Sequence, residues 1–220
     1  MIMFAASSAF SQDCKGFIPT TVNTILEYNH LNPKGKIESS HKMTLKEIKQ
    51  LPEGVSFKTE NVYYDDKQKE TAKSELEYIC SDGKITFNMS SMFDPAMMSQ
   101  YKDMEVKVES EKMEIPSTLQ VGQTLNNGTA TMTISNQGVK MMTMTVVVTN
   151  RKVEAQEQLT VPAGTFECYK ISYDIESKMM FKVQTKAVEW YSMNKGLIKS
   201  ETYDKNGKLT GSTVLKSISN

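Results

Sequence analysis

Hydrophobic and polar residues alternate along most of this chain with a period of two. The runs Ile85–Met89, Ala130–Ile134 and Tyr169–Ile175 are clear examples. Such alternation places one face of a strand in a core and the other in water, which is typical of antiparallel sheets. Threonine, valine and tyrosine, which strands favour, are abundant in these runs. The pattern therefore predicts an all-β protein.

Short turn signals separate the alternating runs. They contain the Gly, Asn, Asp and Pro residues that tight turns require. The signals lie at residues 32–35, 52–54, 65–67, 81–83, 126–128, 136–138, 162–164, 194–196 and 205–207. We therefore predict a single antiparallel, strongly curved sheet of roughly a dozen strands or more, which forms a closed or half-open barrel.

One segment, residues 91–101, departs from the alternation. Asp94 is a suitable cap for a short helix, and Pro95 is suited to its first position. We expect one short helix here, covering an open end or side of the barrel.

The first eleven residues are small or apolar and carry no charge. Ala9-Phe10-Ser11 matches a signal-peptidase site. We interpret residues 1–11 as a signal-peptide remnant and residues 12–220 as a single β-barrel-like domain, which predicts export to the periplasm or the extracellular space. The alternative is that residues 1–11 form an N-terminal strand. No apolar run approaches the roughly 20 residues of a transmembrane helix, so no membrane span is expected.

The chain has three cysteines, Cys14, Cys80 and Cys168. Export permits a disulfide. We predict the pair Cys14–Cys80, because Cys14 begins the mature chain, where an end needs fastening. Cys168 is then a buried free thiol. The alternative pairs Cys80 with Cys168.

Charge and motifs argue against several function classes. The 26 basic and 26 acidic residues balance, which argues against nucleic-acid binding and against strong electrostatic docking on anionic lipid. The two histidines, His30 and His41, with no Cys-x-x-Cys or His-Glu-x-x-His motif, predict no metal site. No Gly-x-Ser-x-Gly elbow occurs, and a couple of Cys168 with either histidine is the remaining nucleophile candidate. We expect no cofactor and no catalytic residue.

Methionine is unusually frequent, with 16 residues. Met142 and Met144 share a strand face with Val146 and Val148, so core packing explains them. Two alternatives are a flexible apolar ligand cavity and a thioether copper site. Under the cavity interpretation, the candidate lining residues are Met97, Met98, Met142, Met144, Met179 and Met180.

Three segments carry a family resemblance: Val161–Ile171 (VPAGTFECYKI), Trp190-Tyr191 with Lys195–Glu201 (KGLIKSE), and Leu119–Gly122. They resemble the TapB-like group, which is related to a domain-of-unknown-function family of exported bacterial β-barrel proteins. The resemblance implies a shared fold from about Asp13 to the C-terminus and supplies no catalytic residues. Within the motifs, residues 162–164 form a tight turn, and Trp190 anchors the core.

These observations favour a non-enzymatic exported envelope protein that binds a hydrophobic or amphiphilic molecule, such as a lipid, in the concave side of its sheet. The alternative is a structural or adaptor protein that binds other envelope proteins. A third hypothesis is a hydrolase with an unrecognised site.

Overall fold

The computed structural model describes residues 16–93, 97–98, 100–101 and 103–220, and thirteen strands lie within them. In chain order they are β1 (Ile25–Leu31), β2 (Ile37–Leu51), β3 (Gly54–Asp65), β4 (Glu70–Ser81), β5 (Lys84–Asn88), β6 (Glu105–Ser110), β7 (Lys112–Pro116), β8 (Gly128–Asn136), β9 (Val139–Val161), β10 (Gly164–Lys178), β11 (Lys182–Ser192), β12 (Gly196–Asp204) and β13 (Leu209–Ser219).

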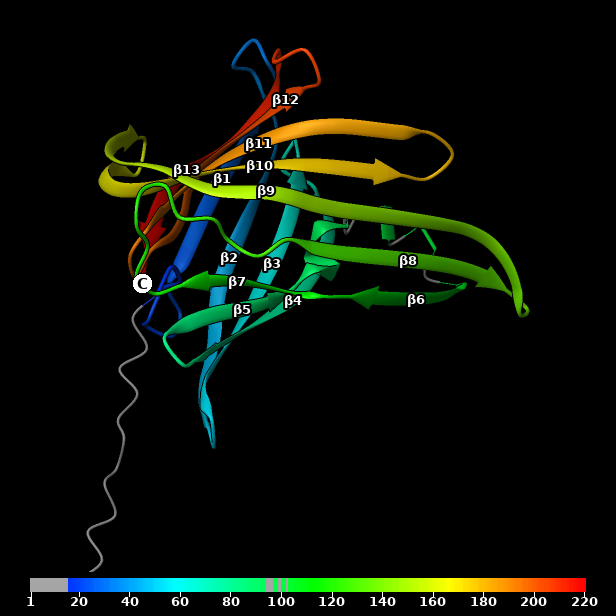
Figure 1. The fold of residues 1–220 in the computed structure, drawn as a ribbon, viewed down its shortest axis with the longest axis horizontal. Helices are drawn as coiled ribbons and strands as arrows, with labels where there is room; N and C mark the ends of the chain where they lie inside the picture. Colours follow the sequence, from blue (N-terminus) through cyan, green and yellow to red (C-terminus); the bar gives the residue numbers. More distant parts are fainter. Residues whose placement is uncertain (1–15, 94–96, 99, 102) are drawn as a thin grey trace, which may run out of the picture.

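All of these strands belong to one antiparallel sheet, in the order β6-β8-β9-β10-β11-β12-β13-β1-β2-β3-β4-β5-β7. The sheet curves strongly on itself, so that β4, β5 and β7 lie across from β9 and β10 (Figure 1). The predicted all-β fold, a single curved antiparallel sheet that nearly closes as a barrel, is confirmed.

The two ends of the sheet are consecutive parts of the chain. β6 pairs with β8, and β7 pairs with β5. Glu111 alone separates them, and its backbone N–H donates to the Thr129 carbonyl, while its carbonyl accepts from Met89. One extended segment therefore supplies both edge strands of the sheet.

Between β7 and β9 the barrel is joined by the loop of residues 117–127 instead of by a ladder. Leu125 N–H donates to the Arg151 carbonyl at 2.9 Å, and Gly122 N–H donates to the Val153 carbonyl at 2.8 Å. The Asn126 side chain accepts from the Glu114 N–H at 3.2 Å. We call this junction of β7, the loop and β9 the seam.

The turn signals of the sequence fall where strands meet. For example, residues 32–35 join β1 to β2, and residues 162–164 join β9 to β10. Gly164 and Gly196 have φ of 133° and 97°, which side chains disfavour. The turn between β10 and β11 was not predicted, because residues 179–181 (Met-Met-Phe) contain no turn-forming residue.

Three clusters of buried hydrophobic residues form the core of the described residues, and the third contains Leu45, Val55 and Phe57. The largest one lies inside the barrel and contains the inward residues of β8, Ala130, Met132 and Ile134, as the alternation predicts. The second surrounds Trp190, which is buried, as predicted, and includes Cys168 and Leu215. Trp190 Nε1 donates to Glu157 Oε1 at 2.7 Å, which satisfies its one polar group.

The chain enters the segment where a short helix is predicted through a 3-10 turn, η1 (Met89–Met92). Asn88 caps it by accepting from the Ser90 N–H at 2.8 Å. Met97 and Met98 are helical, while the expected cap Asp94 and Pro95 lie outside the described residues. So do residues 1–11 and Cys14. No helix in the described part of the chain is long and apolar enough to cross a membrane.

Candidate binding site: a polar cavity inside the sheet

A cavity of about 240 Å³ lies inside the curved sheet and is bordered by strands from both ends of the chain. One part of its wall is apolar. Its residues come from the segment before β1 and from β4, β5 and β7: Phe17, Ile18, Leu76, Ile85, Phe87, Met113 and Ile115. Another part is polar, and its residues come from β1–β4 and β9–β11: Tyr28, His41, Asn61, Tyr63, Tyr78, Arg151, Tyr173, Glu189 and Tyr191. The lining is therefore amphiphilic.

The segment that precedes β1 covers one side of the cavity. The Phe17 ring packs edge-on against the rings of Tyr169 and Tyr191, at centroid distances of 5.9 and 6.2 Å. The Gly16 carbonyl accepts from the Asn194 N–H at 2.8 Å. A Cβ on Gly16 would lie 2.3 Å from Ile85 Cδ1, so glycine permits this close approach.

A β-bulge in β9 directs Arg151 inward. Thr149 pairs with Asp174 and Lys152 pairs with Ser172, so Asn150 and Arg151 together oppose one residue of β10. Asn150 has φ of 55°, which asparagine tolerates better than most residues. Arg151 is 3% exposed. Its Nη1 donates to the Glu114 carbonyl (3.1 Å) and to Asn126, at the backbone oxygen (2.9 Å) and at Oδ1 (3.0 Å). The guanidinium therefore closes the seam.

Glu189 shares the cavity with Arg151. Tyr191 Oη donates to Glu189 Oε2 at 2.8 Å, and the Tyr173 hydroxyl also donates to this carboxyl group. Burial raises the pKa of Glu189, while the two hydroxyls and the charge of Arg151 act in the opposite direction. Burial likewise lowers the pKa of Arg151. The low-dielectric interior therefore disfavours the charged form of both groups.

Three aromatic rings stack across β1, β2 and β3 on the polar wall of the cavity, because their residues are direct neighbours on adjacent strands. His41 pairs with Tyr28 on one side and Tyr63 on the other, and its ring stacks on theirs at 4.6 and 5.3 Å. His41 Nδ1 lies 2.8 Å from His30 Nε2, and His30 Nδ1 lies 2.9 Å from Thr213 Oγ1. Burial, followed by the charge of His30, lowers the pKa of His41 to about 3. The stack is therefore neutral at physiological pH.

Two buried donors on the cavity wall have no hydrogen-bond partner among the described residues: Asn61 Nδ2 and Arg151 Nε. Each belongs to a side chain that is 3% exposed. A buried donor without a partner costs about 1–3 kcal/mol. Such donors in a cavity invite an acceptor, either water or the polar group of a ligand.

The candidate methionines are divided between two locations. Met97, Met98, Met142 and Met144 pack, partly buried, against the largest core cluster. Met179 and Met180 lie between β10 and β11 and are exposed. The cavity itself is lined by other methionines, Met43, Met92 and Met113.

Sequence analysis missed Arg151 and Glu189 as cavity residues. A signal existed for Arg151, because it is the only arginine in 220 residues. Arginine binds several carbonyl groups at once with a rigid fork, which lysine cannot do, so a lone arginine in a lysine-rich chain indicates a specific contact.

The cysteines answer part of the disulfide prediction. Cys168 is a free, fully buried thiol, as predicted, so the alternative pair Cys80–Cys168 is wrong. Burial raises the pKa of Cys168 to about 11, and its sulfur contacts the Phe166 carbonyl, which gives no support to a couple with His30 or His41.

The pair Cys14–Cys80 stays a prediction, because Cys14 lies outside the described residues. Alkylation of the unreduced, denatured protein should label Cys168 only, and alkylation after reduction should label all three cysteines. Peptide mass mapping would detect the linked peptides. Labelling of Cys80 without reduction would contradict the pairing. Loss of the bond would cost about 4 kcal/mol in the chain-entropy model.

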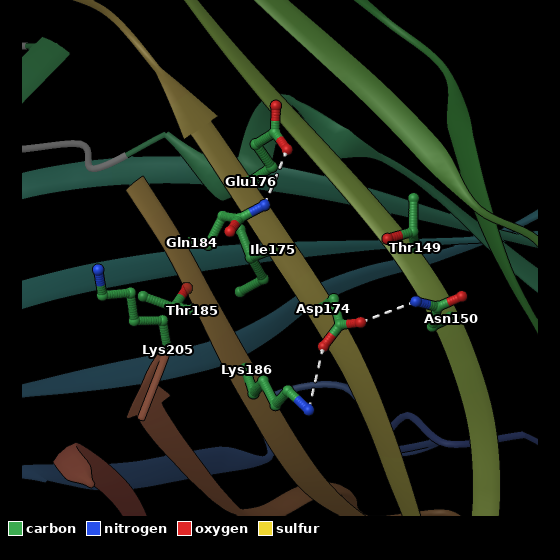
Figure 2. A pocket seen from close by; sticks show the side chains of 9 residues that line it. All are labelled: Thr149, Asn150, Asp174, Ile175, Glu176, Gln184, Thr185, Lys186 and Lys205. Atoms are coloured by element: carbon green, nitrogen blue, oxygen red, sulfur yellow. Dashed lines mark hydrogen bonds and ion pairs between the residues drawn. The ribbon is translucent and has the colours of Figure 1, made fainter. Parts of the chain in front are cut away.

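A second pocket, of about 300 Å³, is lined by residues of β9–β11 and by Lys205 (Figure 2). Its polar groups largely bind one another. Asn150 Nδ2 donates to Asp174 Oδ2 at 2.7 Å, Lys186 lies 3.9 Å from Asp174, and Gln184 donates to Glu176 at 3.4 Å. Most polar side chains of this pocket already have hydrogen-bond or ion-pair partners, whereas the interior cavity has two donors without one. The interior cavity is therefore the stronger candidate site.

A comparison with known protein families gives a match. The model of the DUF3108-like family matches residues 23–215, which is most of the chain. The chain belongs to the DUF3108-like family. This confirms the predicted relation to a family of unknown function, while the likeness to the TapB-like group stays a prediction.

Two solved structures share the fold of this chain. One, from Bacteroides fragilis NCTC 9343, is described as an exported protein with a YmcC-like fold; it is 22% identical, with a TM-score of 0.79. The other, from Parabacteroides distasonis ATCC 8503, is described as a lipoprotein; it is 22% identical, with a TM-score of 0.78. Each match covers 94% of this chain and 100% of the other. No curated protein matches the chain.

Proposed function

We propose that this protein is a non-enzymatic, exported envelope protein that binds a small amphiphilic molecule inside its curved sheet. The observation that carries the proposal is the cavity, which joins an apolar wall to buried donors without partners, Asn61 Nδ2 and Arg151 Nε. Export is supported by the two similar structures, which are described as an exported protein and a lipoprotein, and by the leader-like residues 1–11.

The size of the cavity limits the ligand. Pockets for drug-sized ligands are about 300–1,000 Å³, and this one is about 240 Å³. It therefore suits a small amphiphile, or one end of a longer one. The polar end of that molecule must accept hydrogen bonds, because both unpartnered groups are donors. Its apolar part would lie against Ile85 and Ile115.

The ionisable groups that line the cavity support ligand binding without catalysis. Glu189 is engaged by two tyrosine hydroxyls, and His41 is held neutral between two rings. Cys168 lies in the cluster around Trp190 and does not line the cavity. These positions support a site that orients a ligand and does not transform it.

The test compares bound molecules in three forms of the full chain, each purified from its native envelope. They are the unchanged protein, Leu76→Trp, which fills the cavity, and Glu75→Trp, which adds the same ring on the solvent-facing side of β4. Native mass spectrometry should detect an added mass in the unchanged protein and in Glu75→Trp, and its loss in Leu76→Trp. Uptake of a fluorescent short-chain fatty acid should follow the same order.

Two results would count against the proposal. One is a strictly apo mass for the unchanged protein, together with no uptake of the fluorescent fatty acid. The other is equal ligand loading of Leu76→Trp and the unchanged protein, provided that far-ultraviolet circular dichroism shows both to be folded.

A further inference from the structure

Exposed hydrophobic side chains gather at one end of the sheet. Among the described residues ten large hydrophobic side chains are exposed, and seven of them lie at this end: Met104, Val139, Met141, Met179, Met180, Phe181 and Val183. The β8–β9 and β10–β11 hairpins, which carry six of them, project toward the same side of the molecule (Figure 1). Met104 precedes Glu105, which pairs with Ser135 beside the β8–β9 turn.

The β10–β11 tip, residues 178–183, is the most exposed part of this end. Met180 is 80% exposed and Phe181 is 78% exposed. Single exposed hydrophobic residues are common on protein surfaces and need no explanation. Here four of them, Met179, Met180, Phe181 and Val183, fall within five positions of one tip. A contiguous group of exposed hydrophobic side chains marks a surface that contacts a partner.

Basic residues surround these apolar tips. Lys140 lies between Val139 and Met141, and Lys178 and Lys182 flank the sequence Met-Met-Phe. Neither residues 137–142 nor residues 177–183 contain an acidic residue. Lys182 is paired with Glu176 at 2.6 Å, whereas Lys140 and Lys178 form no ion pair within the described part of the chain.

We propose that the two hairpin tips dock this protein on an anionic lipid bilayer. Met180 and Phe181 would enter the boundary between head groups and acyl chains, and Lys140 and Lys178 would reach the lipid phosphates. Apolar side chains combined with nearby lysines are what interfacial binding requires. The net charge of the whole chain is balanced, which argued against such docking, but residues 137–142 and 177–183 contain lysines and no acidic residue.

The occupant is a bilayer because charge and hydrophobicity alternate within the tips. Lysine and apolar side chains are adjacent in sequence, so one tip contacts two layers of different polarity at once. A bilayer surface presents those layers in that order, with anionic groups outside and hydrocarbon within. The inference goes beyond ligand binding in the cavity and does not depend on it.

Cosedimentation of the full chain with vesicles tests the proposal. Vesicles of equimolar phosphatidylglycerol and phosphatidylethanolamine should bind the protein at low salt, and phosphatidylcholine vesicles should bind it far less. Met180→Ser/Phe181→Ser should lower the partition coefficient tenfold or more. Each of Lys140→Gln and Lys178→Gln should lower it about fivefold, and high salt should remove that difference.

Ile37→Ser/Val121→Ser is the matched control, because it removes two exposed hydrophobic side chains elsewhere on the surface. It should bind vesicles like the unchanged protein. Residues 1–11 are the same in every variant, so the differences report the tips. Equal binding by the Met180/Phe181 variant and the unchanged protein would overturn the proposal. So would tip substitutions that abolish a defined protein cross-link in cells but leave vesicle binding intact, since the tips would then bind a protein.

Discussion

Replacing Arg151 by methionine should lower the free energy of unfolding by about 3 kcal/mol, measured by equilibrium denaturation in urea. Methionine has a similar length but no donor, so the Glu114 and Asn126 carbonyls and Asn126 Oδ1 lose their contact with Nη1. A buried acceptor left without a partner costs about 1–3 kcal/mol. Asn126 is exposed and its Oδ1 keeps the Glu114 N–H, so water and that donor reduce the sum over the three acceptors. Glu189 also loses the nearby positive charge.

Two further variants separate the possible causes. Arg151→Lys keeps the charge but loses the fork geometry, so an intermediate loss is expected. Lys152→Met is the control, because the adjacent Lys152 is exposed and has a surface ion pair with Glu154 at 3.5 Å, worth about 0–1 kcal/mol. If Arg151→Met and Lys152→Met lose equal stability, the seam does not depend on the guanidinium.

The same variant should also have a local effect. Hydrogen exchange of the amides in residues 122–125, which donate to or lie beside β9, should accelerate more in Arg151→Met than that of β2 and β3 amides. A uniform change over the whole sheet would indicate global destabilisation without opening of the seam.

Local sequence patterns were sufficient to predict the strands and most of the turns. Alternation at Ala130–Ile134 identified the residues that face the core, and Gly-containing turns marked most hairpins. Both features act over a few residues, so they can be found in a single sequence. β9 shows where this fails, because its 23 residues continue through the bulge at Asn150 without a glycine or a proline.

The polar cavity could not be predicted in the same way, because its residues meet only after the sheet closes. Glu189 lies between Val188 and Trp190, which pack in the second cluster. Alternation therefore assigns Glu189 to the solvated face. In the structure that face lies inside the barrel and lines the cavity. Glu189 is therefore partly buried and Trp190 is buried, on opposite faces of the sheet. Burial of both faces of β11 depends on strands that are distant in sequence, and the hydrophobic periodicity of one strand carries no information about them.

Acidification should destabilise the protein through His41. Its pKa falls from 6.5 to about 3 in the folded state, chiefly because of burial. Above pH 6.5 His41 is neutral in both the folded and the unfolded chain, so its titration does not change the free energy of unfolding. As the pH falls from 6.5 toward 3, the unfolded chain binds a proton that the folded chain does not, and the free energy of unfolding decreases. Between pH 7 and pH 4.5 the loss is at most about 3 kcal/mol. The lowered pKa of His30 acts in the same direction.

His41→Phe isolates this contribution, because phenylalanine retains stacking between Tyr28 and Tyr63 but does not titrate. The slope of unfolding free energy against pH, obtained from urea titrations, should be shallower in the variant by about one proton between pH 6 and pH 4.5. Glu189 has a raised pKa, so its contribution has the opposite sign: stability present below pH 4.5 is lost as the pH rises. Glu27, whose pKa is lowered to about 2 by Lys42 and Lys216, loses stability in acid as His41 does. Both are present in the two proteins and cancel in the comparison. Equal slopes would show that the ring of His41 is protonated as easily in the folded chain as in the unfolded one.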